Sequence, residues 1–213
     1  MKSVSTINSL WDGTKLEFED QVTVCISFEE ATESVVVSVD APFYNDPKPI
    51  PLNAGSNFDG LWNFEVVEVF IKGKQDKYLE MEMGPHGQYL ILACNGYRQC
   101  FVRGIEPVSY TANIEGSRWS GKLVIQSNLL PPVSAIFSSP FTFNAFSIHN
   151  KKGSENDRVH ASLFPPPKAS EDYRTPDFHK LELFKPLPLP WEFSSPYSSS
   201  LWVEEGPSIS PRE

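Results

Sequence analysis

FEVVEVFIKGKQDKYLEMEMGPHGQYLILAC, residues 64–94, is the stretch that decides the fold. β-branched, aromatic and other apolar residues recur in three runs, at 64–71, 78–83 and 88–94, and short polar segments separate the runs. Their period of two is typical of β-strands, because successive strand side chains point to opposite faces of a sheet. The segment MGPHGQ predicts a tight hairpin between the last two runs, since Pro85 fixes φ and the glycines accept positive φ.

The same rhythm extends on both sides of this stretch, from residue 15 to residue 185. No window of a dozen residues carries an apolar repeat of 3.6 residues, so helices are expected only as short pieces. Many short strands joined by polar turns predict an all-β fold, an antiparallel two-sheet β-sandwich that is jelly-roll-like. The further strands are predicted at 22–28, 35–39, 108–114, 118–126, 141–149, 158–164 and 178–184.

Two segments depart from the strand rhythm. Residues 40–60 form a long polar connection with four prolines, and loops of this length in compact domains often contact ligands. From residue 186 onward the chain is rich in Pro and Ser and has too few apolar residues for a core of its own. We therefore predict one domain at residues 1–185, followed by a flexible tail at 186–213.

Charge and the first residues restrict the partners and the compartment. The formal net charge is -9, which disfavours nucleic acid and anionic membranes, because binding to either requires clustered Lys and Arg. The N-terminal residues contain no apolar signal region, and no apolar run approaches the ~20 residues that span a bilayer. A cytoplasmic or nuclear protein that is not secreted is expected.

The chain has three cysteines, Cys25, Cys94 and Cys100. An odd number without C-x-x-C spacing favours reduced, buried thiols over a disulfide framework. Cys94 and Cys100 could face each other across a hairpin. We nevertheless expect all three to be free thiols.

Familiar catalytic signatures are absent: the sequence has no G-x-S-x-G elbow, no P-loop, no dinucleotide-binding fingerprint and no H-E-x-x-H. The four histidines are scattered along the chain, although His149 and His160 could meet if their strands form a hairpin. A hydrolase that uses Glu68 and His160 is therefore kept as an alternative. Solvent-facing strand histidines explain the pattern better.

A pair of glutamates lies on one face of the strand KYLEMEM. Glu80 and Glu82 are two residues apart, a spacing that a pair of glycosidase carboxylates would allow. The clean alternation instead predicts a solvated Glu face, opposite a buried face formed by Leu79, Met81 and Met83. Catalysis by this pair is not expected.

A third glutamate, Glu68, lies among apolar residues. On its strand face it is flanked by Val66 and Phe70, and Trp62 precedes the strand. A carboxylate in such surroundings is costly to bury unless it accepts hydrogen bonds. It either pairs with Arg or Lys, or it accepts hydrogen bonds from the hydroxyl groups of a ligand.

Several segments together carry a family resemblance. The dipeptide LW at 61–62, EVVEVFI at 65–71 and the G-P-x-G turn are followed by FNAFSIHN at 143–150, RVHASL at 158–163 and DYRTPDFHKLELF at 172–184. In order and spacing these segments resemble the family 9 carbohydrate-binding modules, over roughly residues 12–184. The whole chain also resembles a family of animal proteins named after an open reading frame on human chromosome 4, a name that carries no function.

The resemblance to the carbohydrate-binding modules implies a β-sandwich that holds a sugar ring between two aromatic side chains. Trp62 matches the first aromatic residue, Tyr173 the second, and Glu68 the carboxylate that accepts hydrogen bonds from the sugar. Asn144 and Arg174 match further polar positions, although Asn144 could instead satisfy backbone groups at a strand end and Arg174 could pair with Asp177.

The chain departs from the pattern of these modules at three positions. The second aromatic residue is Tyr where the modules have Trp, Phe146 stands where they have Gln, and Ser170 where they have Asn. The modules also bind calcium at loops, and Asp40, Asn45 and Asp46 could supply oxygen ligands. A turn-rich loop without a metal is the favoured interpretation, so no cofactor and no metal site is predicted.

These observations favour a non-catalytic binding domain for a carbohydrate or another small ligand held between aromatic side chains. An intracellular protein-interaction domain on the same fold is the alternative, because fold alone does not decide function. The expected partners are a glycan, a small molecule or a protein, and not nucleic acid or a membrane.

Overall fold

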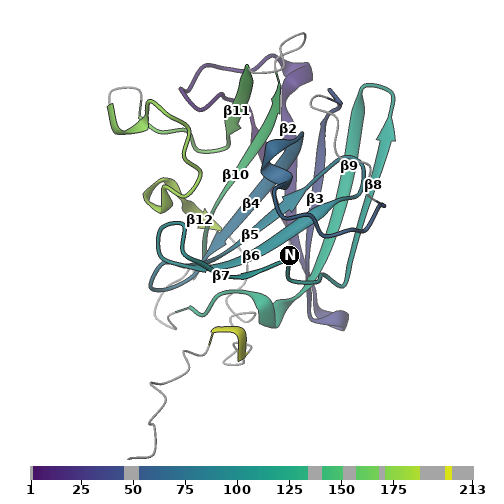
Figure 1. Ribbon diagram of the computed structural model, residues 1–213, viewed down its shortest axis with the longest axis vertical. Coiled ribbons are helices and arrows are strands. Elements are labelled where there is room, and N and C mark those ends of the chain that lie inside the picture. The colour runs from purple at the N-terminus through teal and green to yellow at the C-terminus, as the bar shows by residue number, and fades with distance from the viewer. Residues whose placement is uncertain are drawn as a thin grey trace, which may run out of the picture.

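The computed structural model of the 213-residue chain describes residues 2–45, 53–133, 141–150, 157–167, 171–187 and 200–202. They form two antiparallel β-sheets that pack face to face (Figure 1), which confirms the predicted β-sandwich. The helical pieces in these residues are short 3-10 turns. None of the described helices has the length and apolar character needed to cross a bilayer.

The first sheet has five strands in the order β1-β2-β3-β9-β8. Its strands are β1 (Lys2–Ile7), β2 (Val22–Glu29), β3 (Ser34–Pro42), β8 (Ser109–Glu115) and β9 (Arg118–Gln126).

The second sheet has seven strands, with β11-β10-β4-β5-β6-β7 as its main order and β12 paired to the end of β10. Its strands are β4 (Val66–Lys72), β5 (Lys77–Met83), β6 (Tyr89–Asn95), β7 (Cys100–Arg103), β10 (Phe141–Asn150), β11 (Arg158–Ser162) and β12 (Lys185–Leu187). The 3-10 turns are η1 (Phe18–Asp20), η2 (Glu30–Thr32), η3 (Leu61–Asn63), η4 (Ser127–Leu129), η5 (Glu171–Tyr173), η6 (Leu181–Leu183) and η8 (Ser200–Trp202).

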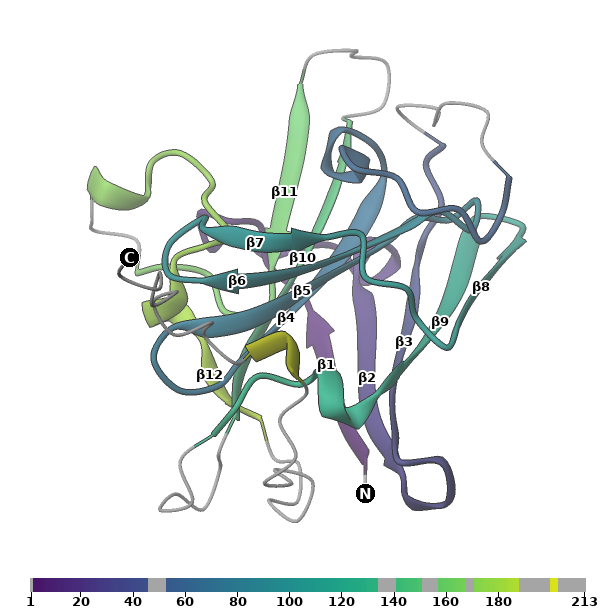
Figure 2. The ribbon, with the colours of Figure 1, turned by 60° about the horizontal axis from the view of Figure 1, so that its bottom comes forward.

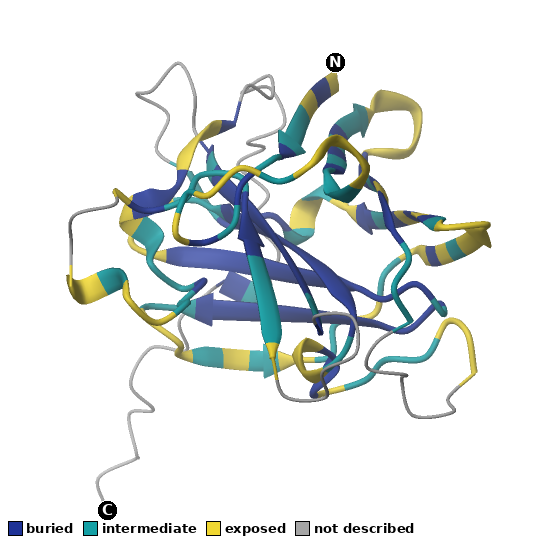
Figure 3. Cartoon of the chain, turned by 90° about the horizontal axis from the view of Figure 1, so that it is seen from above, coloured by how far each residue is buried: buried dark blue, intermediate teal, exposed yellow. Residues whose placement is uncertain are grey.

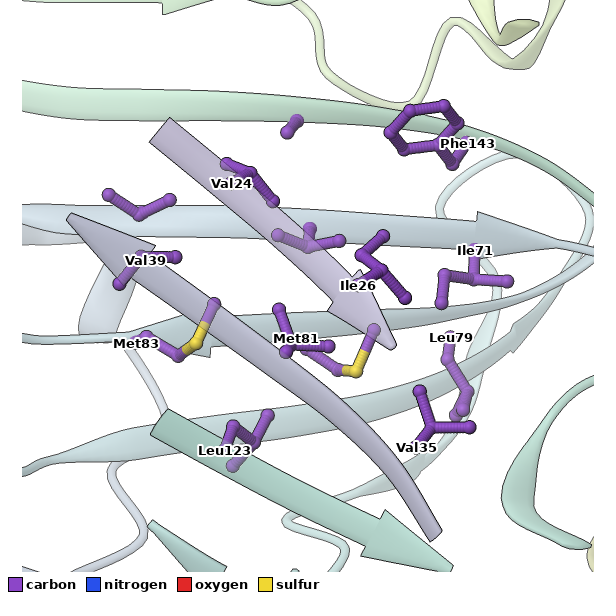
Figure 4. Close-up of a cluster of buried hydrophobic side chains, with 14 of the residues drawn as sticks. Val24, Ile26, Val35, Val39, Ile71, Leu79, Met81, Met83, Leu123 and Phe143 are labelled. Atoms are coloured by element: carbon purple, nitrogen blue, oxygen red, sulfur yellow. The ribbon is translucent and has the colours of Figure 1, made fainter. Parts of the chain in front are cut away.

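The main core lies between the two sheets. Apolar side chains from β2 and β3 meet side chains from β4 and β5, and Figure 4 shows Val24, Ile26, Ile71, Leu79 and Met81 in this layer. All five are buried. Alternation on each strand places one apolar face toward the other sheet, as a β-sandwich requires.

The seven-stranded sheet is also covered on its outer face, the face turned away from the five-stranded sheet. Phe70, Tyr78 and Phe146 on this face pack beneath Phe178 and Phe184 from the segment that precedes β12. Every residue of β5 is therefore buried, and Figure 3 shows strands of this sheet buried along their length. The strands of a sheet that is covered on both faces have nearly continuous apolar sequences, such as QYLILAC at 88–94.

This second layer overturns one prediction. Glu80 and Glu82 were expected on a solvated face, but they are 4% and 0% exposed. Their strand alternates as predicted, with Leu79, Met81 and Met83 facing the other sheet. The expectation was wrong because the face that carries the glutamates is covered by a segment about a hundred residues later in the chain.

The predicted hairpin at MGPHGQ joins β5 and β6. The Gly84 N–H donates to the Gln88 carbonyl at 2.9 Å, and the Gly87 N–H donates to the Gly84 carbonyl at 3.2 Å. Gly87 has φ +88°, and a Cβ there would lie 2.7 Å from the Cβ of Ala54. Glycine is needed at this position for both its backbone angle and its lack of a side chain.

Some strand predictions differ from the structure. Strands β1 and β7 were not predicted: β1 alternates Ser and Thr with only two apolar residues, and β7 has four residues. The segment 178–184 was predicted as a strand but contains the 3-10 turn η6, and the strand β12 begins at Lys185. Its apolar residues cover the outer face of the sheet instead of pairing within it.

Two described pieces of the predicted tail pack on the domain. Leu187 pairs with Phe141 at the end of β10 and is fully buried. Trp202 is 5% exposed, its Nε1–H donates to the Leu129 carbonyl at 3.1 Å, and its own carbonyl accepts from the Lys77 ammonium at 3.3 Å. The packed domain therefore crosses the predicted boundary at residue 185, and the division beyond these pieces stays a prediction.

The cysteine prediction was wrong for two of the three thiols. Cys94 and Cys100 form a disulfide bond between β6 and β7, and Cys25 is free. The turn after β6 reverses the chain and brings these two residues into register as partners, with their Cα atoms 3.8 Å apart. Counting cysteines could not reveal this register.

Replacing the buried tryptophan of η8 tests whether the C-terminal piece stabilises the domain. We expect Trp202→Ala to lower the free energy of unfolding by about 3 kcal/mol, the usual cost of truncating a buried aromatic side chain. The control Phe18→Ala, at a side chain that is 85% exposed, should change it by less than about 0.5 kcal/mol. Urea denaturation of both variants measures the difference, and equal stabilities would show that residues 200–202 add nothing to the core.

Candidate functional site

A pocket with a volume of about 440 Å³ opens on the outer face of the seven-stranded sheet. Strands β4 to β7 and β10 to β11 carry part of its lining, and η3, the β6–β7 turn and the segment 171–187 carry the rest. This segment, yellow-green in Figure 2, lies beside the β6–β7 turn. The lining consists of Trp62, Asn63, Glu68, Glu80, Leu92, Arg98, Cys100, Arg103, Ile148, Arg158, Pro176, Phe178 and the two histidines His160 and His179.

Three glutamates form a buried cluster at the floor of this pocket, called here the glutamate triad: Glu68, Glu80 and Glu82. One carboxyl oxygen from each lies within 4.8 Å of the others. Glu68 on β4 is directly opposite Glu82 on β5, and Glu80 is two residues from Glu82 on the same face. The three side chains are at most 4% exposed.

Burial disfavours the charged form of all three carboxyls. It raises the pKa of Glu68 and Glu82 well above the usual range, and the neighbouring carboxylates of the triad raise both further. The pKa of Glu80 is raised to about 7, again mainly by burial, although Arg98 and Arg103 oppose the shift. Within the described residues, Glu80 Oε2 and both oxygens of Glu82 have no hydrogen-bond partner.

Three arginines surround the glutamates but are held by other groups. Arg98 donates to Asp177 at 2.8 Å, and Arg103 Nε donates to Asp59 at 2.7 Å. Arg158 donates to the backbone carbonyls of residues 62 and 63, both at 2.7 Å. The structure records no ion pair within 4 Å between Glu68 and any described cation, so neither Arg nor Lys fills the pairing role considered for it.

The surroundings of the two histidines in the lining disfavour their charged forms. Burial and the nearby Arg98 lower the pKa of His179 to about 4. Its Nδ1 is 2.7 Å from the Tyr78 hydroxyl, and its Nε2 is 3.8 Å from Glu80 Oε2. Burial, followed by the charge of Arg158, lowers the pKa of His160.

His149 and His160, which could have met across a hairpin, do not face each other. Strand register places His160 opposite Ile148, and His149 opposite Val159, so the two imidazoles lie on opposite faces of the β10–β11 pair. His149 stacks on Tyr44, with ring centroids 3.8 Å apart. Glu68 and His160 do line the same pocket.

Two of the five residues predicted to form the binding site lie in this pocket. Trp62 is 37% exposed, and the Arg103 guanidinium lies 5.5 Å from the centre of its ring. Glu68 lies on the floor. Tyr173 lies outside the lining: its carbonyl accepts from the Trp11 indole at 2.7 Å and its hydroxyl donates to Glu182 at 3.2 Å.

The other two predicted site residues make structural contacts. Asn144 is fully buried, and its side chain accepts from the Phe164 N–H at 3.1 Å and donates to the Phe164 carbonyl at 3.2 Å. It fixes the chain that follows β11, in agreement with its alternative role. Arg174 is exposed and pairs with Glu171, not with Asp177, because Arg98 binds Asp177.

The departures from the carbohydrate-binding pattern have structural partners too. Phe146 stacks on Phe178, with ring centroids 3.9 Å apart. This contact packs the segment 171–187, called here the covering segment, onto the sheet. Ser170 lies outside the described residues. Of the oxygens considered for calcium, Asp40 pairs with Arg118 and the Asn45 side chain lies 3.0 Å from His86, while position 46 is also outside the described residues.

Sequence reasoning missed most of the polar lining. Arg98, Arg103, Arg158 and His179 are single residues in turns and at strand ends, with no motif that marks them. Glu80 was seen but was assigned to solvent. The available signal was the nearly continuous apolar character of 64–71 and 88–94, which is typical of strands buried on both faces.

The architecture defines a class: a β-sandwich with a pocket on the outer face of one sheet, floored by buried carboxyls. Among curated proteins, the UPF0462 protein C4orf33 homolog of Mus musculus is 38% identical over 184 residues, which cover 85% of this chain and 88% of the mouse protein. The chain belongs to this UPF0462 family, as the resemblance to a family named after a human chromosome 4 reading frame predicted. No protein-family profile matches the chain.

Two solved structures align with the chain, and the first of them shares its fold. A candidate carbohydrate-binding protein from Bacteroides uniformis aligns with a TM-score of 0.60 and 14% identity, over 85% of this chain and 84% of that one. A family 9 carbohydrate-binding module from Caldicellulosiruptor kristjanssonii, in complex with glucose, aligns with a TM-score of 0.39 and 13% identity, over 80% and 76% of the two chains. The first alignment shows a shared fold, and neither alignment assigns a role to a residue.

Neutralising one member of the triad should stabilise the protein. We expect Glu82→Gln to raise the free energy of unfolding by about 1 kcal/mol or more in a chelator-containing buffer at pH 7.5. The substitution removes repulsion between carboxyl groups of the triad, and the new amide N–H groups can donate to the two remaining carboxyls. The exposed Glu115→Gln should leave it within about 0.5 kcal/mol. Chemical denaturation compares the two, and a destabilised Glu82→Gln variant would show that the carboxyl has a favourable partner.

Proposed function

We propose that the pocket binds a carbohydrate or a similarly hydroxylated small molecule without transforming it. The observation that carries this proposal is the position of Trp62 at the exposed rim of a pocket whose floor contains the buried carboxyl of Glu68. An aromatic face packs on the C–H groups of a sugar ring, while buried acceptors hydrogen-bond its hydroxyls. The fold shared with a candidate carbohydrate-binding protein supports the same class of ligand.

The dimensions and polarity of the pocket agree with such a ligand. Its volume of about 440 Å³ falls in the range of about 300–1,000 Å³ that is common for small-ligand sites. Glu68 and Glu80 offer acceptors at the floor, and the guanidinium groups of Arg98 and Arg158 in the wall offer donors. Hydroxyl groups both donate and accept, so they can use both sets.

The clamp inferred from the resemblance changes in this proposal. Because Tyr173 lies outside the lining, the ligand would pack on Trp62 from one side and contact Phe178 and Pro176, which line the same pocket. A protein partner on the same fold remains the alternative.

A thermal-shift panel of monosaccharides and disaccharides, followed by titration calorimetry on any hit, tests the proposal. We expect at least one sugar to raise the unfolding midpoint, because a ligand that binds only the folded state stabilises it. Trp62→Ala should weaken that binding at least about 10-fold by removing the packing face. Phe18→Ala, which removes an exposed aromatic residue elsewhere, should bind like the wild type.

Two results would contradict the proposal. One is a panel in which no sugar shifts the midpoint at millimolar concentration, which would favour the protein-partner alternative. The other is a hit whose affinity is the same for Trp62→Ala and the wild type, because that ligand would bind outside the pocket.

A further inference from the structure

The glutamate triad differs from an ordinary acidic cluster because all three residues are almost completely buried. Its carboxyl oxygens lie within 4.8 Å of one another, and its side chains are 2%, 4% and 0% exposed for Glu68, Glu80 and Glu82. Like charges directly opposite on neighbouring strands are destabilising, and Glu68 and Glu82 are such a pair. Water would screen the charged forms of these carboxyls, but at this depth screening is weak, so the charged forms are disfavoured unless a cation lies beside them.

A second observation points to a missing partner. Glu82 is fully buried, faces the other two glutamates, and neither of its carboxyl oxygens has a hydrogen-bond partner outside the triad among the described residues. Buried polar atoms in folded proteins are almost always paired. The nearby cations do not supply the partner, because Arg98 and Arg103 are bound to Asp177 and Asp59.

We propose that the triad binds a hard divalent cation, with Ca²⁺ as the best fit. Carboxylate oxygens are the ligands that such ions prefer, and oxygens bound at about 2.3–2.6 Å from one ion lie no more than about 5 Å apart. The separation of up to 4.8 Å between the triad oxygens meets this condition. The three ligands are all oxygens, which distinguishes the site from the nitrogen and sulfur sets that zinc favours.

The cation would connect the floor to the pocket. Glu68 and Glu80 line the pocket, and Glu82, directly opposite Glu68 on the same sheet face, is buried outside the lining, so the three carboxylates would hold the ion from the sheet side. Ca²⁺ takes six to eight oxygen ligands, and the positions that face the pocket would be filled by water or by ligand hydroxyls. The contact between the ion and ligand hydroxyls rests on the proposed function, but cation binding itself does not.

Cation binding is tested on the full chain after treatment with EDTA and in the absence of sugar. We expect titration calorimetry to show one Ca²⁺ site, and the unfolding midpoint to rise by about 5 °C at roughly 100 times the Kd. Mn²⁺ or Mg²⁺ should compete for the site. Glu82→Gln and Glu68→Gln should each weaken Ca²⁺ binding at least about 10-fold, while Glu115→Gln binds like the wild type.

Several outcomes would overturn the inference. They are no heat and no shift with millimolar Ca²⁺, Mg²⁺ or Mn²⁺, binding of Zn²⁺ alone, or an equal Ca²⁺ response in Glu82→Gln and the wild type. Misfolding cannot explain a loss in Glu82→Gln if that variant unfolds at or above the wild-type midpoint in EDTA.

The two proposals fail separately. Sugar binding that persists in EDTA, with no cation site, would overturn the cation and keep the proposed function. A Ca²⁺ site without any sugar response would keep the cation and contradict the proposed function. Trp62→Ala should retain Ca²⁺ affinity within about 2-fold, because the indole is not a ligand to the ion.

Discussion

The covering of the seven-stranded sheet on both faces is the constraint on which the rest of the structure depends. One face meets the five-stranded sheet, and the other lies beneath the segment 171–187. Without that outer layer, Glu68, Glu80 and Glu82 would be a hydrated acidic face of an ordinary sandwich. With it, they become desolvated groups at the floor of a pocket, where their protonation and their partners matter for both stability and binding.

The cost of burying three carboxyls is carried by the apolar layers around them. The core between the sheets consists mainly of Val, Ile, Leu and Met side chains that are almost completely buried. On the outer face, Phe70, Phe146 and Phe178 pack beside the triad, and each such ring removes a large apolar area from water. This apolar burial offsets the cost of a buried carboxyl cluster that would destabilise a smaller core.

The link between the outer layer and the sheet is made by the β6–β7 turn. The disulfide between Cys94 and Cys100 closes the base of this turn, and Arg98 near its tip donates to Asp177 of the covering segment. Tyr97 donates to the same carboxylate at 2.8 Å. Because Cys100 and Arg98 also line the pocket, the shape of the site depends on how firmly this turn holds the segment.

The sequence predicted what local alternation encodes and missed what distant segments impose. Period-two runs located β2 to β6 and β8 to β11, and a lone carboxylate among apolar residues marked Glu68 as unusual. Residues 178–184 of the covering segment were predicted as a strand. Their apolar residues show no period that distinguishes a strand from an irregular segment that packs on a sheet. Whether Glu80 is exposed depends on that distinction. If the outer face of the sheet is open, the alternation predicts a solvent-exposed carboxyl, and if another segment covers that face, the same alternation predicts a desolvated one.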